Sequence, residues 1–134
     1  MISHHDALIY TMVLVSAADR EMTDAEMLSM GDIVLHLPIF RDFDRGSLLK
    51  ATSACAEMLS DGDGLKKIFK QIKAGLPAKL RETAYALACD VAAADAQVSQ
   101  EEARMLEMIR HELEIGRLPA AAIERGAKAR HALL

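Results

Sequence analysis

The chain has 134 residues, which is enough for one globular domain but not for two. About half of the residues are apolar (51%), which excludes a disordered chain, and a net charge of −4 without a dense Lys or Arg run argues against a nucleic-acid partner. The longest apolar stretches, around residues 7–18 and 84–94, are shorter than the ~20 residues that span a bilayer, and no secretory signal is recognisable. We therefore expect a cytoplasmic protein with no transmembrane segment.

A periodicity near 3.6 residues runs along the chain and predicts an all-α fold of about seven helices. In chain order, we expect helices at residues 4–18, 24–36, 45–59, a fourth that contains Leu65 to Ile72, and then 77–94, 100–114 and 119–131. The first and the fifth are apolar nearly all round, so we expect them to lie at the centre of a compact array and to cross there. Asp61-Gly62-Asp63-Gly64 is interpreted as a turn with glycine in the left-handed conformation, not as a calcium loop, because Lys66 and Lys67 follow it.

Two segments of the chain are nearly identical in pattern. Val15 to Glu26 and Val91 to Glu102 share the form V-[SA]-A-A-D-x-x-[MV]-[ST]-x-x-E, and each places a short corner between an apolar helix and an amphipathic one. We interpret them as an internal duplication within one domain, residues 1–134, with repeat units at approximately 4–36 and 80–114.

Part of this shared pattern is explained by helix capping. Thr23 and Ser99 each precede a predicted helix, and Glu26 and Glu102 follow three residues later, which is the capping box. The four residues are therefore expected to stabilise helix starts, with about 1 kcal/mol from each hydroxyl. Capping does not account for the aspartate of each corner.

Asp19 and Asp95 need a different explanation, because a carboxylate near the end of a helix opposes the helix dipole. One alternative is an Asx-type turn, in which the carboxylate accepts backbone amides two or three residues further on. The other is a cation site at which Asp19, Glu26, Asp95 and Glu102 come together, supported by Glu21, Asp24 and Glu101, if the two corners converge. Oxygen ligands alone would favour calcium or magnesium over zinc.

Other reactive residue types show no functional spacing. Cys55 and Cys89 lie in apolar helical patterns and are expected to be buried and reduced. The histidines have no metal-ligand spacing and are assigned to the surface or to helix caps, and the methionines to the core. No nucleophile, phosphate-binding or dinucleotide motif appears, so no catalytic residue and no cofactor beyond calcium or magnesium is predicted.

The doubled A-A-D-x-x-[MV]-[ST]-x-x-E corner resembles the tellurite-resistance TerB-like family, from about Ala7 to about Leu113. This resemblance implies a compact helical array in a bacterial stress system, with suggested roles in metal sensing and in scaffolding at the inner face of the membrane. The positions that match are Asp19, Glu26, Asp95 and Glu102. The chain departs from the family pattern at Arg20, where a small residue is frequent, and at Gln97, where an acid is frequent.

Three function hypotheses follow. The first is a non-enzymatic binding or scaffold module of a tellurite-resistance-type system, with protein partners and a peripheral membrane association through one of them. The alternative is a calcium- or magnesium-binding stress protein that uses the acidic corners. A hydrolase with Asp19 and Asp95 as paired carboxylates is the third hypothesis, although no substrate cleft is recognisable in the sequence.

Overall fold

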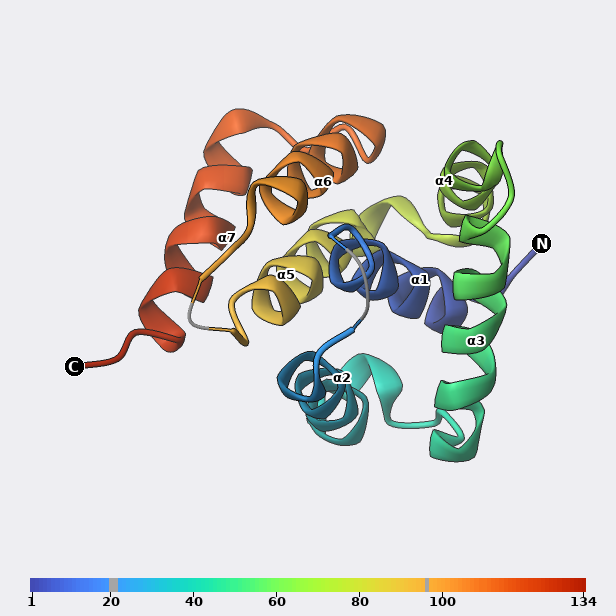
Figure 1. Cartoon of the computed structure of the whole chain (residues 1–134), viewed down its shortest axis with the longest axis horizontal. Helices are drawn as coiled ribbons and strands as arrows, with labels where there is room; N and C mark the ends of the chain where they lie inside the picture. Colours follow the sequence, from blue (N-terminus) through green and yellow to red (C-terminus); the bar gives the residue numbers. More distant parts are fainter. Residues whose placement is uncertain (20–21, 96) are drawn as a thin grey trace.

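The computed structural model describes residues 1–19, 22–95 and 97–134, and over these residues it contains seven α-helices and no strand. Figure 1 shows the helices wrapped around one centre, with the two termini at opposite ends of the view. The helices are α1 (His4–Ser16), α2 (Asp24–His36), α3 (Leu48–Leu59), α4 (Gly64–Gly75), α5 (Arg81–Ala92), α6 (Gln100–Glu112) and α7 (Arg117–Arg130). Three short 3₁₀ turns connect them: η1 (Pro38–Phe40), η2 (Arg45–Ser47) and η3 (Ala78–Leu80).

Helices α1 and α5 form the centre, as the sequence predicts. Every residue of α1 from Ala7 to Ser16 is buried, and α5 buries Tyr85, Leu87 and Val91 among others. The α1–α5 contact is the most extensive in the fold; α1 also packs against α3, α4 and α6, and α5 against α2, α6 and α7. Because the outer helices need only one apolar face, they can keep charged residues on the other.

Three predicted helix starts are wrong by two to four residues. Residues 45–47 form η2 and not the first turn of α3, because the Asp44 carboxylate accepts from the Gly46 amide at 3.1 Å and closes a separate turn. Residues 78–80 likewise form η3 before α5 begins. Helix α7 begins at Arg117, so Pro119 is its third residue, still within the first turn, where a missing amide proton costs nothing.

The glycine interpretation of the Asp61–Gly64 turn is also corrected. No glycine of the chain has a positive φ. Gly64 is required for a different reason, since a Cβ on this residue would lie 1.9 Å from the Met58 carbonyl oxygen. The chain turns so tightly between α3 and α4 that only a residue without a side chain fits there.

The cysteines, histidines and methionines lie where the sequence predicts, except for His5 and two methionines. Cys55 and Cys89 are buried and unpaired, and burial raises the pKa of both thiols to about 12. His5 is not a surface residue; its ring packs against Phe40 and Phe43. Most methionines lie in or against the core, but Met27 and Met108 are exposed.

Candidate functional site

The first corner joins α1 to α2 and is fixed by a capping box. The Thr23 hydroxyl oxygen accepts from the Glu26 amide at 3.1 Å, and the Thr23 amide donates to Glu26 Oε1 at 3.0 Å. These two bonds satisfy amides at the start of α2 that have no partner within the helix. They also hold the Glu26 carboxylate back over the corner, instead of letting it extend into solvent.

The second corner, between α5 and α6, repeats this geometry. Ser99 Oγ accepts from the Glu102 amide at 3.1 Å, and the Ser99 amide donates to Glu102 Oε1 at 3.0 Å. The two N-cap residues share nearly the same backbone conformation, with ψ at 163° in both. The duplicated sequence pattern therefore produces two equivalent local structures.

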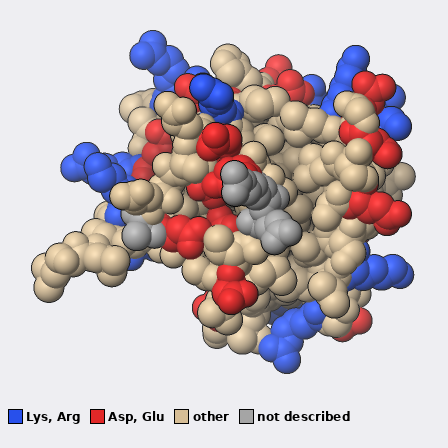
Figure 2. All heavy atoms as spheres, viewed as in Figure 1, with Lys and Arg blue, Asp and Glu red and all other residues tan. Residues whose placement is uncertain are grey.

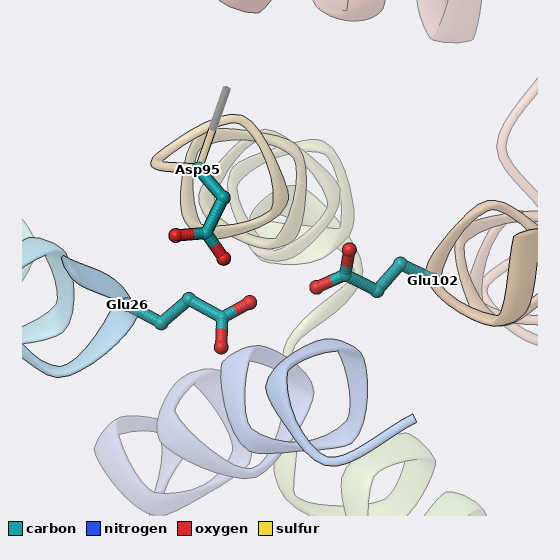
Figure 3. Close-up of side chains that lie close together, drawn as sticks. All are labelled: Glu26, Asp95 and Glu102. Carbon is teal, nitrogen blue, oxygen red and sulfur yellow. The ribbon is translucent and has the colours of Figure 1, made fainter. Parts of the chain in front are cut away.

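The two corners converge. Figure 3 shows the carboxylates of Glu26, Asp95 and Glu102 pointing toward one another, from α2, from the segment after α5 and from α6. One oxygen from each side chain lies within 4.8 Å of the other two. Thr23 connects the corners directly, because its hydroxyl donates to the Asp95 carboxylate at 3.3 Å.

Two of these three carboxylates are removed from solvent. Glu26 is 1% exposed and Glu102 is 2% exposed, whereas Asp95 is half-buried and provides an opening to the surface. Glu26 Oε2 is buried without a hydrogen-bond partner among the described residues. A buried carboxylate oxygen without a partner is costly, so the geometry is incomplete unless a proton, a water or a cation fills it.

Glu26, Asp95 and Glu102 together form what we call the three-carboxylate centre, and the close approach of their carboxylates affects its electrostatics. Burial, with the adjacent Glu26 carboxylate, raises the pKa of Glu102 from 4.5 to about 7, although the Ser99 amide opposes the shift. Acidic side chains also gather around the middle of this face, with Lys and Arg mostly toward its edges (Figure 2). Near neutral pH the Glu102 carboxyl group is therefore close to the point at which it loses its proton.

Asp19 does not belong to this three-carboxylate centre, although it was predicted as a ligand. Its charge has the smallest of the effects that raise the pKa of Glu102. The Asx-turn alternative for Asp19 involves the amides of residues 21 and 22, of which residue 21 lies outside the described residues, as do the Arg20 and Glu21 side chains. For Asp95 the hydrogen bond in the described part of the chain comes from Thr23, not from a backbone amide further along.

The sequence predicts Glu26 and Glu102 as capping residues and as candidate ligands, but it does not predict that they are the buried members of the centre. It also does not predict that Thr23 bonds to the opposite corner as well as capping α2. The remaining acids of the predicted patch, Asp24 and Glu101, are exposed. The one available signal was the duplication itself, because the same capping glutamate occurs after two helices that pack together.

The centre offers oxygen atoms only, which is the ligand type that hard cations such as calcium and magnesium prefer. Calcium binds oxygen at about 2.3–2.6 Å, so ligands on opposite sides of the ion lie about 4.6–5.2 Å apart; for magnesium that span is about 4.2 Å. The three oxygens lie within 4.8 Å of one another, an upper limit that fits either ion. Asp95 also lines a hollow of about 530 Å³ between α5, α6 and α7.

Comparison with known proteins gives one match. A search of curated proteins and a search of solved structures each find nothing similar to this chain. No helix in the described residues is long and apolar enough to cross a membrane. The model of the family described as tellurite resistance protein TerB matches residues 5–125, which include both corners and all three carboxylates, and the chain therefore belongs to the TerB family.

Proposed function

We propose that this TerB module binds a divalent cation, calcium or magnesium, at Glu26, Asp95 and Glu102. The observation that supports the proposal is the buried Glu26 Oε2, which has no hydrogen-bond partner in the described residues and belongs to a group of three convergent carboxylates. An ion at this point would satisfy that oxygen and offset the repulsion among the three charges.

Binding would also join parts of the chain that are far apart in sequence. The three ligands come from the start of α2, the segment after α5 and the start of α6. An ion bound only by the folded chain stabilises that state by mass action. A change in cation concentration would then change the rigidity of the two corners, which is how the module would respond to a cation.

We infer further that the module acts by binding and without catalysis, as a component of a tellurite-resistance-type stress system. The residues of the centre are carboxylates alone, and a paired-carboxylate hydrolase would need a substrate held between an acid and a base. Asp19, one member of the pair considered from sequence, lies outside the three-carboxylate centre.

The test is a thermal melt of chelator-treated protein with and without added calcium or magnesium at millimolar concentration. Glu102→Gln preserves the capping box, because glutamine is accepted at that position, but removes one ligand charge. Asp95→Asn likewise keeps an acceptor for the Thr23 hydroxyl. We expect calcium to raise the melting temperature of the parent chain by several degrees, and of these two variants by much less.

The matched control is Glu101→Gln, which removes the neighbouring charge from an exposed side chain. It should keep the full calcium response. A parent melt that is unchanged by millimolar calcium and magnesium would rule out the cation function. Equal responses in all four proteins would show that the ion binds elsewhere.

A further inference from the structure

Helix α4 presents a basic face over an apolar groove. It has four lysines and no acidic residue, and Lys66, Lys67, Lys70 and Lys73 are all exposed. Together with α6 it borders a groove of about 850 Å³, which is also lined by Leu65, Phe69 and Met108. Met108 is 40% exposed.

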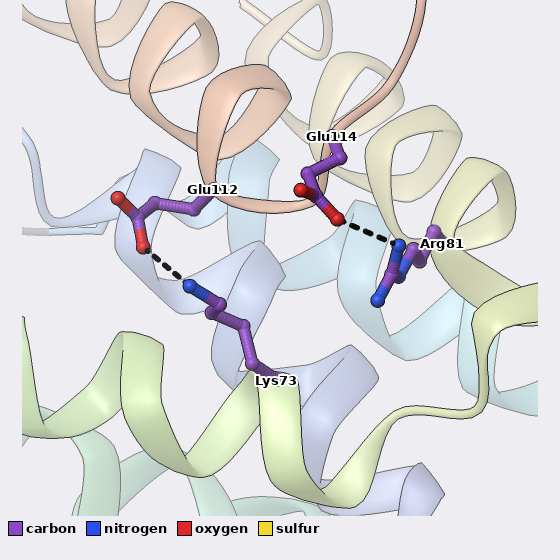
Figure 4. Close-up of polar contacts among 4 residues, drawn as sticks. All are labelled: Lys73, Arg81, Glu112 and Glu114. Carbon is purple, nitrogen blue, oxygen red and sulfur yellow. Dashed lines mark hydrogen bonds and ion pairs between the residues drawn. The ribbon is translucent and has the colours of Figure 1, made fainter.

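Only one of these lysines has an ion-pair partner in the described residues. Lys73 Nζ lies 3.4 Å from Glu112 Oε1 and joins α4 to α6 at one end of the groove (Figure 4). Lys66, Lys67 and Lys70 make no ion pair within residues 1–19, 22–95 and 97–134. The groove therefore has an apolar floor and three lysines on its rim that make no ion pair in the described residues, and the Asp63 carboxylate also lines it.

Helix α2 presents the complementary surface. A stripe on one face of the helix consists of Asp24, Met27, Leu28, Gly31, Asp32 and Leu35, which are spaced three or four residues apart. Together with Arg45, Gly46 and Leu48 these residues line an open hollow of about 830 Å³. Leu28 is 70% exposed and Leu35 is 48% exposed. The stripe thus combines two exposed leucines, one helical repeat of seven apart, with two carboxylates beside them.

The two surfaces match in chemistry and in length. An amphipathic helix that docks in a groove inserts apolar anchors at such a spacing, and lysines on the rim can pair with its carboxylates. α2 has 13 residues and α4 has 12, so the two helices have nearly the same length. Figure 1 shows α2 and α4 at separate edges of the molecule, with α1 between them, so both surfaces are accessible to another copy.

We propose that α2 of one copy docks in the α4–α6 groove of a second copy. The contact joins two different surfaces, so it is head-to-tail, and repetition of it produces chains or closed rings. The proposal does not depend on the cation centre. It assigns this chain a role as the repeating unit of an assembly.

The test is sedimentation of the purified full chain from about 10 µM to about 1 mM, at low and at high salt. Two variants each remove one surface. Lys66→Glu/Lys70→Glu reverses the charge of the rim, and Leu28→Ser/Leu35→Ser removes the apolar anchors of α2; all four side chains are exposed, so the fold should survive. Lys79→Glu/Lys128→Glu is the charge-matched control, because both lysines are exposed and lie outside the two surfaces.

We expect the parent chain and the control to grow in mass with concentration from 14.6 kDa, and growth to weaken at high salt. Each surface variant alone should self-associate at least about tenfold more weakly. An equimolar mixture of the two variants should form a 1:1 dimer that grows no further, because the first keeps an intact α2 and the second keeps an intact groove.

Three results would overturn the proposal. A parent chain that stays monomeric at about 1 mM and low salt excludes the contact. A mixture of the two variants that stays monomeric shows that the surfaces do not bind each other. A monomeric parent that binds anionic phospholipid vesicles through Lys66 and Lys70, and does not need Leu28 or Leu35, assigns the groove to a membrane surface instead.

Discussion

The two ends of α6 both present glutamates, but in opposite environments. At the first end Glu102 is 2% exposed and faces Glu26 and Asp95 without a basic side chain in the three-carboxylate centre. At the last end Glu112 is about half exposed and Glu114, two residues further on, is largely exposed; each lies within 3.4 Å of a lysine or arginine nitrogen (Figure 4). Water solvates the exposed glutamates, so their ion pairs contribute little to stability. The buried Glu102 instead needs a proton or a cation to offset the cost of burying its charge.

The largest expected consequence of this difference is the pH dependence of stability in the absence of a cation. The folded pKa of Glu102 is about 7, above its ordinary value of 4.5. Between these values the unfolded chain releases a proton that the folded chain keeps, so the free energy of unfolding falls as pH rises. The contribution of this group falls by at most about 1.4 kcal/mol per pH unit and changes little below pH 4.5 or well above 7.

Urea unfolding in the presence of a chelator, from pH 4 to pH 8, measures this contribution as a difference between proteins. Glu102→Gln should remove the fall between pH 4.5 and 7 and leave a flatter profile. Glu112→Gln is the control from the other end of the helix and should keep the parent slope. Parallel profiles for the parent and Glu102→Gln would mean that the centre does not hold a proton.

The next largest effect is a difference in stability between variants of the two capping residues, Ser99 and Thr23. Ser99→Ala removes one cap and should cost about 1 kcal/mol. Thr23→Ala removes an equivalent cap and also the hydroxyl that donates to Asp95, so it should cost about 2 kcal/mol. Urea unfolding at constant pH compares the two, with Thr23→Ser as the variant that keeps the hydroxyl and most of the stability. Equal losses for both alanine variants would show that the Thr23–Asp95 contact contributes nothing.

A smaller effect, of opposite sign, is expected at the last end of α6. Glu114 has φ of 55°, a left-handed conformation in which a side chain is unfavourable, and the Ile115 amide closes the helix onto the Arg110 carbonyl. Glu114→Gly should therefore stabilise the chain by about 0.5–1 kcal/mol, even though it removes the Arg81 ion pair. Glu114→Ala, which removes the same ion pair but keeps a Cβ, is the control and should give no gain in the same thermal melts.

The fold was predictable because its signals are local. A periodicity of 3.6 residues and the boxes at Thr23–Glu26 and Ser99–Glu102 define where helices run and begin, and two helices that are apolar nearly all round are expected at the centre. The errors occurred where local signals are ambiguous. Residues 45–47 and 78–80 suit a 3₁₀ turn as well as a helix, and at residues 45–47 the single hydrogen bond from the Gly46 amide to the Asp44 carboxylate favours the turn.

The candidate site was only half predictable. The residue types and the duplication identified the correct corners, but their convergence depends on how α1 and α5 cross, which no local pattern encodes. Burial was the second missing quantity, because S/T-x-x-E has the same form on an exposed helix as at Glu26 or Glu102. The Thr23–Asp95 contact joins the two copies of the motif, so it could not be found in either copy alone.

The smallest expected effect concerns the Lys73–Glu112 ion pair, and it tests whether an exposed ion pair contributes little to stability. Both side chains are about half exposed, at 50% and 42%, and such pairs contribute about 0.2–1 kcal/mol. Lys73→Met keeps the aliphatic stem over the groove and removes only the charge, so it should cost less than about 0.5 kcal/mol and nothing at about 1 M salt.

Lys67→Met is the control, because Lys67 is exposed and has no ion pair in the described residues. Urea unfolding of dilute protein, at which self-association is negligible, measures the difference. A loss of more than about 1 kcal/mol in the free energy of unfolding of Lys73→Met, independent of salt, would contradict the difference between the two ends of α6. An exposed ion pair would then contribute as much to stability as the buried carboxylate.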